Sequence, residues 1–308
     1  MRLLFLAILA AAAAALVPRE TRVPVGRASL YVRVVGQGPP VLVLHGGPDF
    51  DHSYLLPELD RLGDAFRVVY YDQRGRGRSR GPLDLAAIDI DLFVDDLDAL
   101  RRHFAAESAV ALLGHSWGGL LAMHYALRHP RLTSHLILLN TAPASTAEME
   151  RAGGERVRRR ARYAGRMEAL AASAEFNAGE PAAVSEYWNL DFATTFARPQ
   201  DAQRLVIRST REDTLRGRAV EECLMRGLYD EPSFDLAGRL RGLEGVPTLV
   251  IHGELDFIPV EASVQIAGAI PHARLELLRD SGHFSYIDAA PRVRELLAAF
   301  YPATGSRE

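Results

Sequence analysis

The sequence predicts an α/β fold in which a mostly parallel central sheet carries helices on both faces and is interrupted by a helical insertion. Short apolar runs of strand length alternate with longer segments whose apolar residues have helical spacing. This alternation stops across residues 141–243, where the spacing is helical and no strong apolar run occurs. The insertion is therefore expected to pack on the sheet-containing core as a separate helical unit.

Apolar runs and turn residues locate the individual elements. Residues 22–35 alternate polar and apolar side chains around Gly26 and are expected to form a hairpin. The expected buried strands are residues 41–44, 67–71, 109–113, 135–139, 248–251 and 275–278. The expected helices are residues 90–104, 120–128 and 260–269. We divide the chain into a core of residues 18–140 and 244–308 and a cap subdomain of residues 141–243.

An arginine-rich stretch stands out in the expected cap. Its members are Arg156, Arg158, Arg159, Arg160, Arg162 and Arg166. Since Glu155 and Glu168 flank it, we interpret it as the solvated side of a helix rather than as an anion-binding face.

Composition excludes several classes of protein. The chain has 308 residues, of which 48% are hydrophobic and 24% charged, so a disordered or disulfide-framework protein is excluded. A net charge of -3 gives no basic field for nucleic acid. All 36 basic residues are arginine, which excludes a lysine Schiff base and a phosphate-binding Gly-Lys-Ser/Thr loop.

Neither a metal nor another cofactor is expected. The 10 histidines show no clustered ligand spacing. Residues 70–79 lack the third glycine of a dinucleotide-binding loop, and we interpret them as a structural loop. Cys223 has no partner for an intramolecular disulfide and is expected to be a small buried residue in a helix.

The N-terminus has the features of a secretory signal peptide. Met1-Arg2 precedes an apolar run over residues 3–17 that contains an Ala-x-Ala site. This run is too short for a stable membrane span. We therefore expect cleavage near residue 17 and a secreted or periplasmic protein, with an alanine-rich extension on a cytoplasmic protein as the alternative.

A candidate nucleophile lies between an apolar run and a helical pattern. Gly114-His-Ser-Trp-Gly118 has the Gly-x-Ser-x-Gly spacing in which a serine stands on a sharp strand-to-helix turn with its hydroxyl exposed. Glycine at both ends leaves room for the close backbone approach that such a turn requires. The pattern predicts Ser116 as the nucleophile.

A serine nucleophile needs a base, and the base needs an orienting carboxylate. Asp256 follows the apolar run 248–251, and His283 follows the run 275–278. The chain order serine, acid, histidine is the one that this strand-turn-helix site uses. We therefore predict catalytic roles for Ser116, Asp256 and His283.

Four other residues with acidic or imidazole side chains lie near these positions. Glu254 and Asp280 are alternatives for the orienting acid. His115 is expected to pack under the serine turn, and His252 to support the loop of Asp256.

Charge that develops on a tetrahedral intermediate needs backbone donors. One is expected from the residue after the nucleophile, Trp117, and the other from the loop His45-Gly-Gly-Pro48 through Gly47.

From about Arg22 to its C-terminus the sequence resembles the α/β-hydrolase superfamily and, within it, the proline iminopeptidase-like serine peptidases. The motifs that carry the resemblance are His45-Gly-Gly-Pro48, Tyr71-Asp-Gln-Arg-Gly75 with Gly77-Arg-Ser79, Gly114-His-Ser-Trp-Gly118, His252-Gly-Glu-Leu-Asp256 and Gly282-His283. The resemblance implies a triad of Ser116, Asp256 and His283, an oxyanion hole at Gly47 and Trp117, and a helical cap that selects the substrate.

In that family, cap glutamates hold the free N-terminal amine of the substrate. The candidates for this role here are Glu175, Glu180, Glu186, Glu212, Glu221 and Glu222. One departure stands beside the motif of the first loop, where Asp49 occupies a position that is usually glycine in the family.

The sequence therefore predicts a serine hydrolase acting on a small molecule or short peptide. The first hypothesis is an aminopeptidase that releases N-terminal residues, proline first, and the alternative is a carboxylic-ester hydrolase or lactonase. A non-catalytic receptor on the same fold is the third, and a complete set of triad and oxyanion positions weighs against it. The oligomeric state is left open.

Overall fold

The computed structural model of the chain describes residues 17–47, 49–229 and 234–301. The predicted signal peptide therefore lies outside the described residues except for Val17. Within the described ranges, no helix combines the length and the apolar character that crossing a membrane requires.

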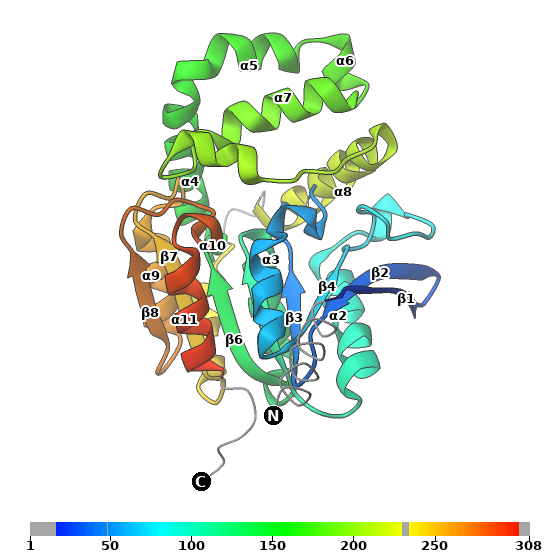
Figure 1. Cartoon of the computed structure of the whole chain (residues 1–308), viewed down its shortest axis with the longest axis vertical. Helices are drawn as coiled ribbons and strands as arrows, with labels where there is room; N and C mark the ends of the chain where they lie inside the picture. The colour runs from blue at the N-terminus through cyan, green and yellow to red at the C-terminus, as the bar shows by residue number, and fades with distance from the viewer. Residues whose placement is uncertain (1–16, 48, 230–233, 302–308) are drawn as a thin grey trace, which may run out of the picture.

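An eight-stranded sheet in the order β1-β2-β4-β3-β5-β6-β7-β8 forms the centre of the molecule (Figure 1). The pairs β1–β2 and β2–β4 are antiparallel, and all the other neighbours are parallel. This confirms the predicted mostly parallel sheet. The strands are β1 (Arg19–Val25), β2 (Ala28–Val35), β3 (Pro40–Leu44), β4 (Arg67–Tyr71), β5 (Val110–His115), β6 (Thr133–Leu139), β7 (Thr248–Gly253) and β8 (Arg274–Leu278).

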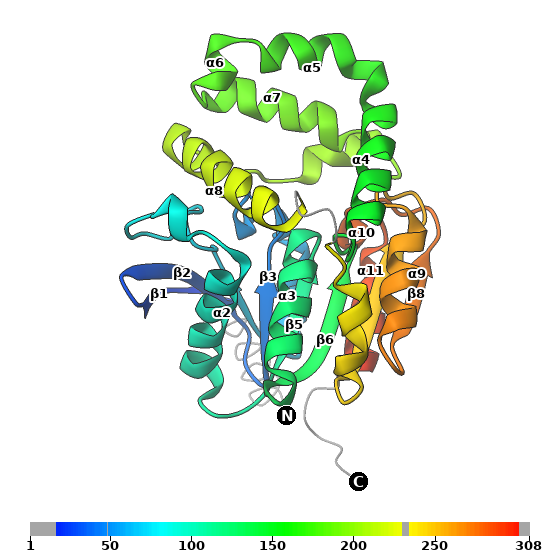
Figure 2. The same cartoon turned by 180° about the vertical axis from the view of Figure 1, so that it is seen from behind.

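Helices cover both faces of the sheet, as predicted, and one group projects beyond its upper edge (Figures 1 and 2). The helices that flank the sheet are α2 (Ile90–Ala105), α3 (Trp117–Arg128), α9 (Val260–Ala269), α10 (Ser285–Asp288) and α11 (Ala290–Phe300). Those in the insertion are α4 (Thr146–Arg160), α5 (Ala164–Ala171), α6 (Ala174–Asn177), α7 (Pro181–Phe192) and α8 (Arg211–Tyr229). Helices α10 and α11 have no counterpart among the helices predicted from the sequence.

Two apolar cores lie on the two faces of the sheet because successive strand residues point to opposite sides. On β3, for example, Leu42 and Leu44 belong to one core, while Val41 and Val43 belong to the other. The first core includes residues of α2, α3 and α8, and the second includes residues of α7, α10 and α11. Both cores thus extend into the insertion, one through α8 and the other through α7.

The start of α3 packs unusually close to the end of β3. A Cβ atom built on Gly118 would lie 2.1 Å from the carbonyl oxygen of Leu44 and 2.7 Å from that of His45. Both contacts are backbone, so neither can swing away. Only glycine therefore allows α3 to begin at this place beside the sheet.

Gly118→Ala is expected to lower the free energy of unfolding by more than about 2 kcal/mol, because the added methyl group must push α3 away from β3. Gly153→Ala is the matched control, since Gly153 lies within α4 and has nothing within 4 Å of its built Cβ. There alanine should add about 0.5–1 kcal/mol. Urea unfolding with an unchanged slope measures both, and equal effects at the two sites would contradict the packing argument.

Candidate active site

Ser116 occupies the sharp turn between β5 and α3. Its φ of 54° lies in the left-handed region, which is rare for a residue with a side chain. The turn is held on both sides, because the Ser116 N–H donates to the carbonyl of Leu139 at 3.2 Å and the Ser116 carbonyl accepts from Ala142 N–H at 2.9 Å. A strained backbone fixed in this way is typical of functional sites.

His283 and Asp256 form a buried pair. The Nδ1 atom of His283 lies 2.9 Å from Oδ2 and 3.0 Å from Oδ1 of Asp256. Although burial alone would raise the pKa of the Asp256 carboxyl, the neighbouring His283 lowers it to about 2. Asp256 is therefore ionised and accepts a hydrogen bond from the Nδ1–H group, which leaves Nε2 of His283 available as a base.

The two alternative acids lie elsewhere. Glu254 and Asp280 are both exposed, whereas Asp256 is 4% exposed. His252 supports the acid loop through hydrogen bonds of 2.9 Å to the carbonyl of Ile258 and to the Ser263 hydroxyl.

Asn140 is a site residue that the sequence analysis missed. Its Nδ2 atom donates to Asp256 Oδ2 at 2.8 Å and to the carbonyl of Gly282 at 3.1 Å, and its Oδ1 atom accepts from Ser285 Oγ. It therefore ties the acid loop to the histidine loop. The residue directly follows β6 and has a φ of 45°, but no motif in the sequence indicates its role.

The loop after β3 is fixed by a buried network next to Ser116. Gln73 N–H donates to Nε2 of His45 at 3.1 Å, and Gln73 Nε2 donates to the His45 carbonyl at 2.8 Å. The Trp117 indole N–H in turn donates to Gln73 Oε1 at 3.0 Å. Gly47 in this loop has a φ of 111°, and Trp117 opens α3, so its backbone N–H has no acceptor within the helix.

A second network joins the same loop to the histidine loop through His115. Gly46 N–H donates to the Tyr54 hydroxyl at 2.6 Å, which lies 2.8 Å from Nδ1 of His115. The Nε2 atom of His115 is 3.0 Å from the carbonyl oxygen of His283. Burial lowers the pKa of His115 to about 3. A neutral ring with its proton on Nε2 satisfies every one of these partners.

One pocket brings the candidate residues together. Ser116 and His283 line it with Gly46, Gly47, Tyr54 and His115 of the core. Its remaining wall is mostly aromatic and comes from both units: Phe50, Phe257 and Phe284 from the core, and Trp188 and Phe192 from α7. Such a wall suits an apolar acyl group placed next to the serine.

Of the six candidate glutamates, the described pocket wall contains only Glu221. Glu175 is exposed. The other four pair with arginines outside the pocket: Glu180 with Arg211, Glu186 with Arg166, Glu212 with Arg216 and Glu222 with Arg226. The structure therefore favours Glu221 of α8 for contact with substrate.

Glu221 shares the pocket with a second acid, Asp49. Burial and the charge of Asp49 together raise the pKa of Glu221 to about 7, although Arg76 acts in the opposite direction. Burial likewise raises the pKa of Asp49. Below about pH 7 Glu221 therefore holds a proton that it would lose in water.

The interpretation of the arginine-rich stretch as a solvated helix side is wrong for three of its members. Arg156 lines the pocket and, with Arg160, pairs with the fully buried Asp191 of α7. Arg159 donates to the carbonyls of Leu255 and Asp256, at 2.5 Å and 2.8 Å. Helical spacing alone does not show that a charged side faces another element rather than water.

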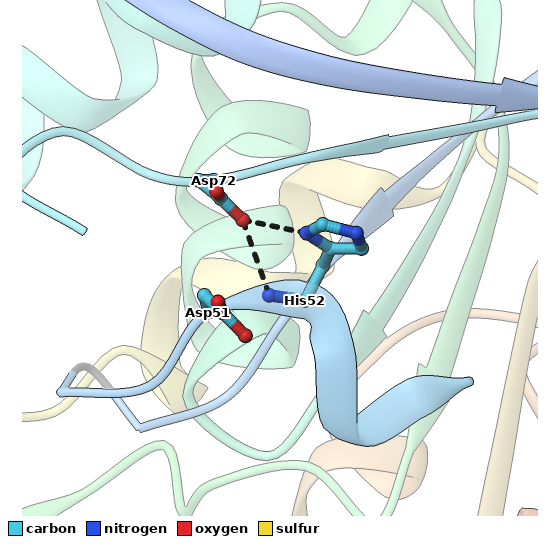
Figure 3. A group of neighbouring side chains, drawn as sticks. All are labelled: Asp51, His52 and Asp72. Atoms are coloured by element: carbon cyan, nitrogen blue, oxygen red, sulfur yellow. Dashed lines mark hydrogen bonds and ion pairs between the residues drawn. The ribbon is translucent and has the colours of Figure 1, made fainter. Parts of the chain in front are cut away.

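Asp51, His52 and Asp72 form a compact group whose potential ligand atoms lie within 4.8 Å of one another (Figure 3). Hydrogen bonds already use these atoms. Asp72 Oδ1 is 2.6 Å from Nδ1 of His52, Asp72 Oδ2 accepts from Arg78 N–H at 2.7 Å, and Asp51 Oδ1 accepts from Ser53 N–H at 2.8 Å. The group is explained as a brace between the loops after β3 and β4.

Tyr54→Phe is expected to lower the free energy of unfolding by about 1–3 kcal/mol, because it leaves Gly46 N–H and His115 Nδ1 buried without partners. Tyr71→Phe is the matched control, since no described residue bonds the buried Tyr71 hydroxyl. Its removal should be neutral or stabilising. Chemical denaturation of both variants measures the difference, and equal losses would contradict the proposed network.

Glu221→Gln is expected to stabilise the protein increasingly as the pH rises from about 4.5 to about 7. Because the folded-state pKa is raised, the wild-type acid favours folding below its unfolded value of 4.5 and loses this contribution as the pH passes 7. The uncharged amide does not undergo this loss. Thermal melts of both proteins across this range test it, and a difference independent of pH would contradict it.

Comparison with known proteins agrees with this architecture. Residues 39–290 match the family described as alpha/beta hydrolase fold. The proline iminopeptidase of Saccharolobus solfataricus is 28% identical over 274 residues, which are 87% of this chain and 86% of that protein. The crystal structure of the proline iminopeptidase of Mycobacterium smegmatis is 25% identical with a TM-score of 0.66, and the alignment covers 92% of this chain and 97% of that one.

An esterase from Exiguobacterium antarcticum has the same fold, with a TM-score of 0.67, 23% identity and coverage of 92% of this chain and 99% of that one. The iminopeptidases and the esterase differ in activity, so their likeness to this chain shows a shared fold. The family match spans well over half of the chain, so the chain belongs to the alpha/beta hydrolase fold family.

Proposed function

We propose that the protein is a serine hydrolase that releases N-terminal residues from short peptides or amino-acid amides. The observation that carries this proposal is the presence in one pocket of Ser116, His283 and Glu221. The first two supply acyl-transfer chemistry, and the third supplies a carboxylate for a substrate's ammonium group. The likeness to two proline iminopeptidases supports the same choice of substrate.

The proposed reaction begins when Ser116 Oγ attacks the carbonyl carbon of the scissile amide while Nε2 of His283 takes the hydroxyl proton. Asp256 accepts the Nδ1 hydrogen bond and stabilises the imidazolium that forms. The N–H groups of Gly47 and Trp117 are proposed to stabilise the oxyanion. The leaving amine takes the proton from His283, and water then cleaves the acyl-enzyme by the same steps in reverse.

Substrate selection in this proposal uses the mixed character of the pocket. The ring or side chain of the N-terminal residue packs against the aromatic wall that includes Phe50 and Trp188. Its ammonium group is placed to pair with Glu221. Since the pocket is partly buried, this ion pair is screened less than one at the surface.

A carboxylic-ester hydrolase is the second candidate. Arg156 brings a positive charge to the pocket wall. This charge would repel a substrate with an ammonium group but not a neutral ester. The same nucleophile and base serve either substrate. The two activities therefore differ only in whether a free amine contributes to kcat/KM.

L-prolyl nitroanilide should be cleaved with a kcat/KM at least about tenfold above that of its N-acetyl derivative, because acetylation removes the ammonium charge. Ser116→Ala should lower kcat by at least about 10³-fold. Both are measured by nitroaniline release, with a short-chain nitrophenyl ester assayed in parallel. Hydrolysis of the ester alone would reject the aminopeptidase and leave the esterase. Equal rates for wild type and Ser116→Ala would reject both.

A further inference from the structure

Asp49 lies where the core meets the cap. It belongs to the loop that follows β3, and it lines the pocket together with Ser116 and Glu221. The helix α8 passes directly over it, because a Cβ built on Gly217 would lie 3.1 Å from the Asp49 carbonyl oxygen. One carboxylate thus reaches the pocket from the core loop and another from the cap helix.

A buried cation accompanies these two acids. Arg76 is 1% exposed, and no described residue accepts a hydrogen bond from any of its three guanidinium nitrogens. Its Nη1 atom would be 2.9 Å from a Cβ on Gly217, so the guanidinium lies beside α8 and the Asp49 backbone. A buried charge without a nearby opposite charge is strongly unfavourable. Burial lowers the pKa of Arg76, and the negative charges of Asp49 and Glu221 act in the opposite direction without cancelling this effect.

The carboxylates of Asp49 and Glu221 are free to bind a group in the pocket. Among the described residues, no side chain forms a hydrogen bond or an ion pair with the carboxylate of Asp49 or of Glu221, although the Asp49 carboxylate is bonded by its own backbone N–H. The charge of Asp49 repels that of Glu221 and so raises the pKa of Glu221, although the charges of Arg76, Arg156 and Arg218 lower the pKa of both acids. A cation placed between them would relieve this repulsion and satisfy both groups.

The geometry points to Asp49 as a second specificity-determining residue, which binds the substrate's ammonium group from the core side while Glu221 binds it from the cap side. This inference rests on the proposed function, and it adds a residue from the core loop to the role given there to Glu221. An ammonium group has several N–H donors, so a carboxylate on each side can accept hydrogen bonds that water would otherwise accept. Because core and cap each supply one acid, a bound amine also joins the two units.

A simpler role for Asp49 is to neutralise Arg76. In that case its substitution would weaken folding and lower the rates with all substrates by a similar factor. A role in ammonium binding instead changes the ratio between a charged substrate and an uncharged substrate of the same shape. The deciding quantity is therefore a ratio of two kcat/KM values within one variant.

The experiment uses the full chain with the p-nitrophenyl esters of L-proline and of cyclopentanecarboxylic acid, which differ by the ring nitrogen. The ratio of their kcat/KM values is measured for wild type, Asp49→Asn, Glu221→Gln and Glu222→Gln. We expect the ratio to fall at least about tenfold in Asp49→Asn and in Glu221→Gln, since each loses a charged hydrogen bond. Glu222→Gln is the matched control and should keep the wild-type ratio, because Glu222 pairs with Arg226 at the surface.

The outcomes distinguish failure of the proposed function from failure of the role given to Asp49. A wild-type ratio near one would overturn the proposed function itself. A wild-type preference that Glu221→Gln abolishes and Asp49→Asn retains would overturn only the inference about Asp49. If thermal melts show that Asp49→Asn does not fold, Asp49→Glu keeps the charge beside Arg76 but displaces the carboxylate by one methylene. That variant should then lower the ratio while its melting temperature stays near wild type, and an unchanged ratio would reject the inference.

Discussion

The rest of the site depends on the strained turn at Ser116. Its positive φ directs the chain from β5 into α3 without an intervening loop, and the close contact at Gly118 sets α3 against the end of β3. The same contact brings the loop after β3 beside the serine. A Cβ on Gly46 would lie 3.0 Å from the Ser116 Cβ atom, so this loop also requires glycine at closest approach. The strain is therefore stored at the turn that places Ser116 in the wall of the pocket.

Neutral buried histidines hold the loops around this turn. Burial lowers the pKa of His45 to about 4 and that of His115 to about 3, and it lowers the pKa of His252 as well. A neutral imidazole offers one donor and one acceptor, so each ring can join two backbone segments. His45 and His115 fix the loop after β3, whereas His252 fixes the acid loop. His283 differs in having its Nδ1 atom on a carboxylate.

The core and the nucleophile turn were predictable because their patterns are local. A buried parallel strand is a continuous apolar run, and Gly114-x-Ser-x-Gly118 specifies its own turn, so β3 to β8 were found within a few residues of their observed ends. Asn140 and Glu221 were not predictable in this way. Asn140 contacts Asp256, which lies 116 residues further along the chain. Glu221 lines the pocket because of the direction in which α8 faces the core. The arginines of α4 show the same limit, because their partner Asp191 lies on another helix.

Core and cap are joined by charge as well as by apolar packing. Arg159 of α4 bonds the carbonyl of Asp256, the acid that orients His283, while Arg156 of the same helix bonds Asp191 and lines the pocket. A shift of α4 would therefore disturb the position of Asp256 and the shape of the pocket together. Because both arginines lie within one turn of a single helix, a movement of α4 acts on the pocket wall and on the acid loop at the same time. The pocket wall and the acid loop are thus both in contact with α4.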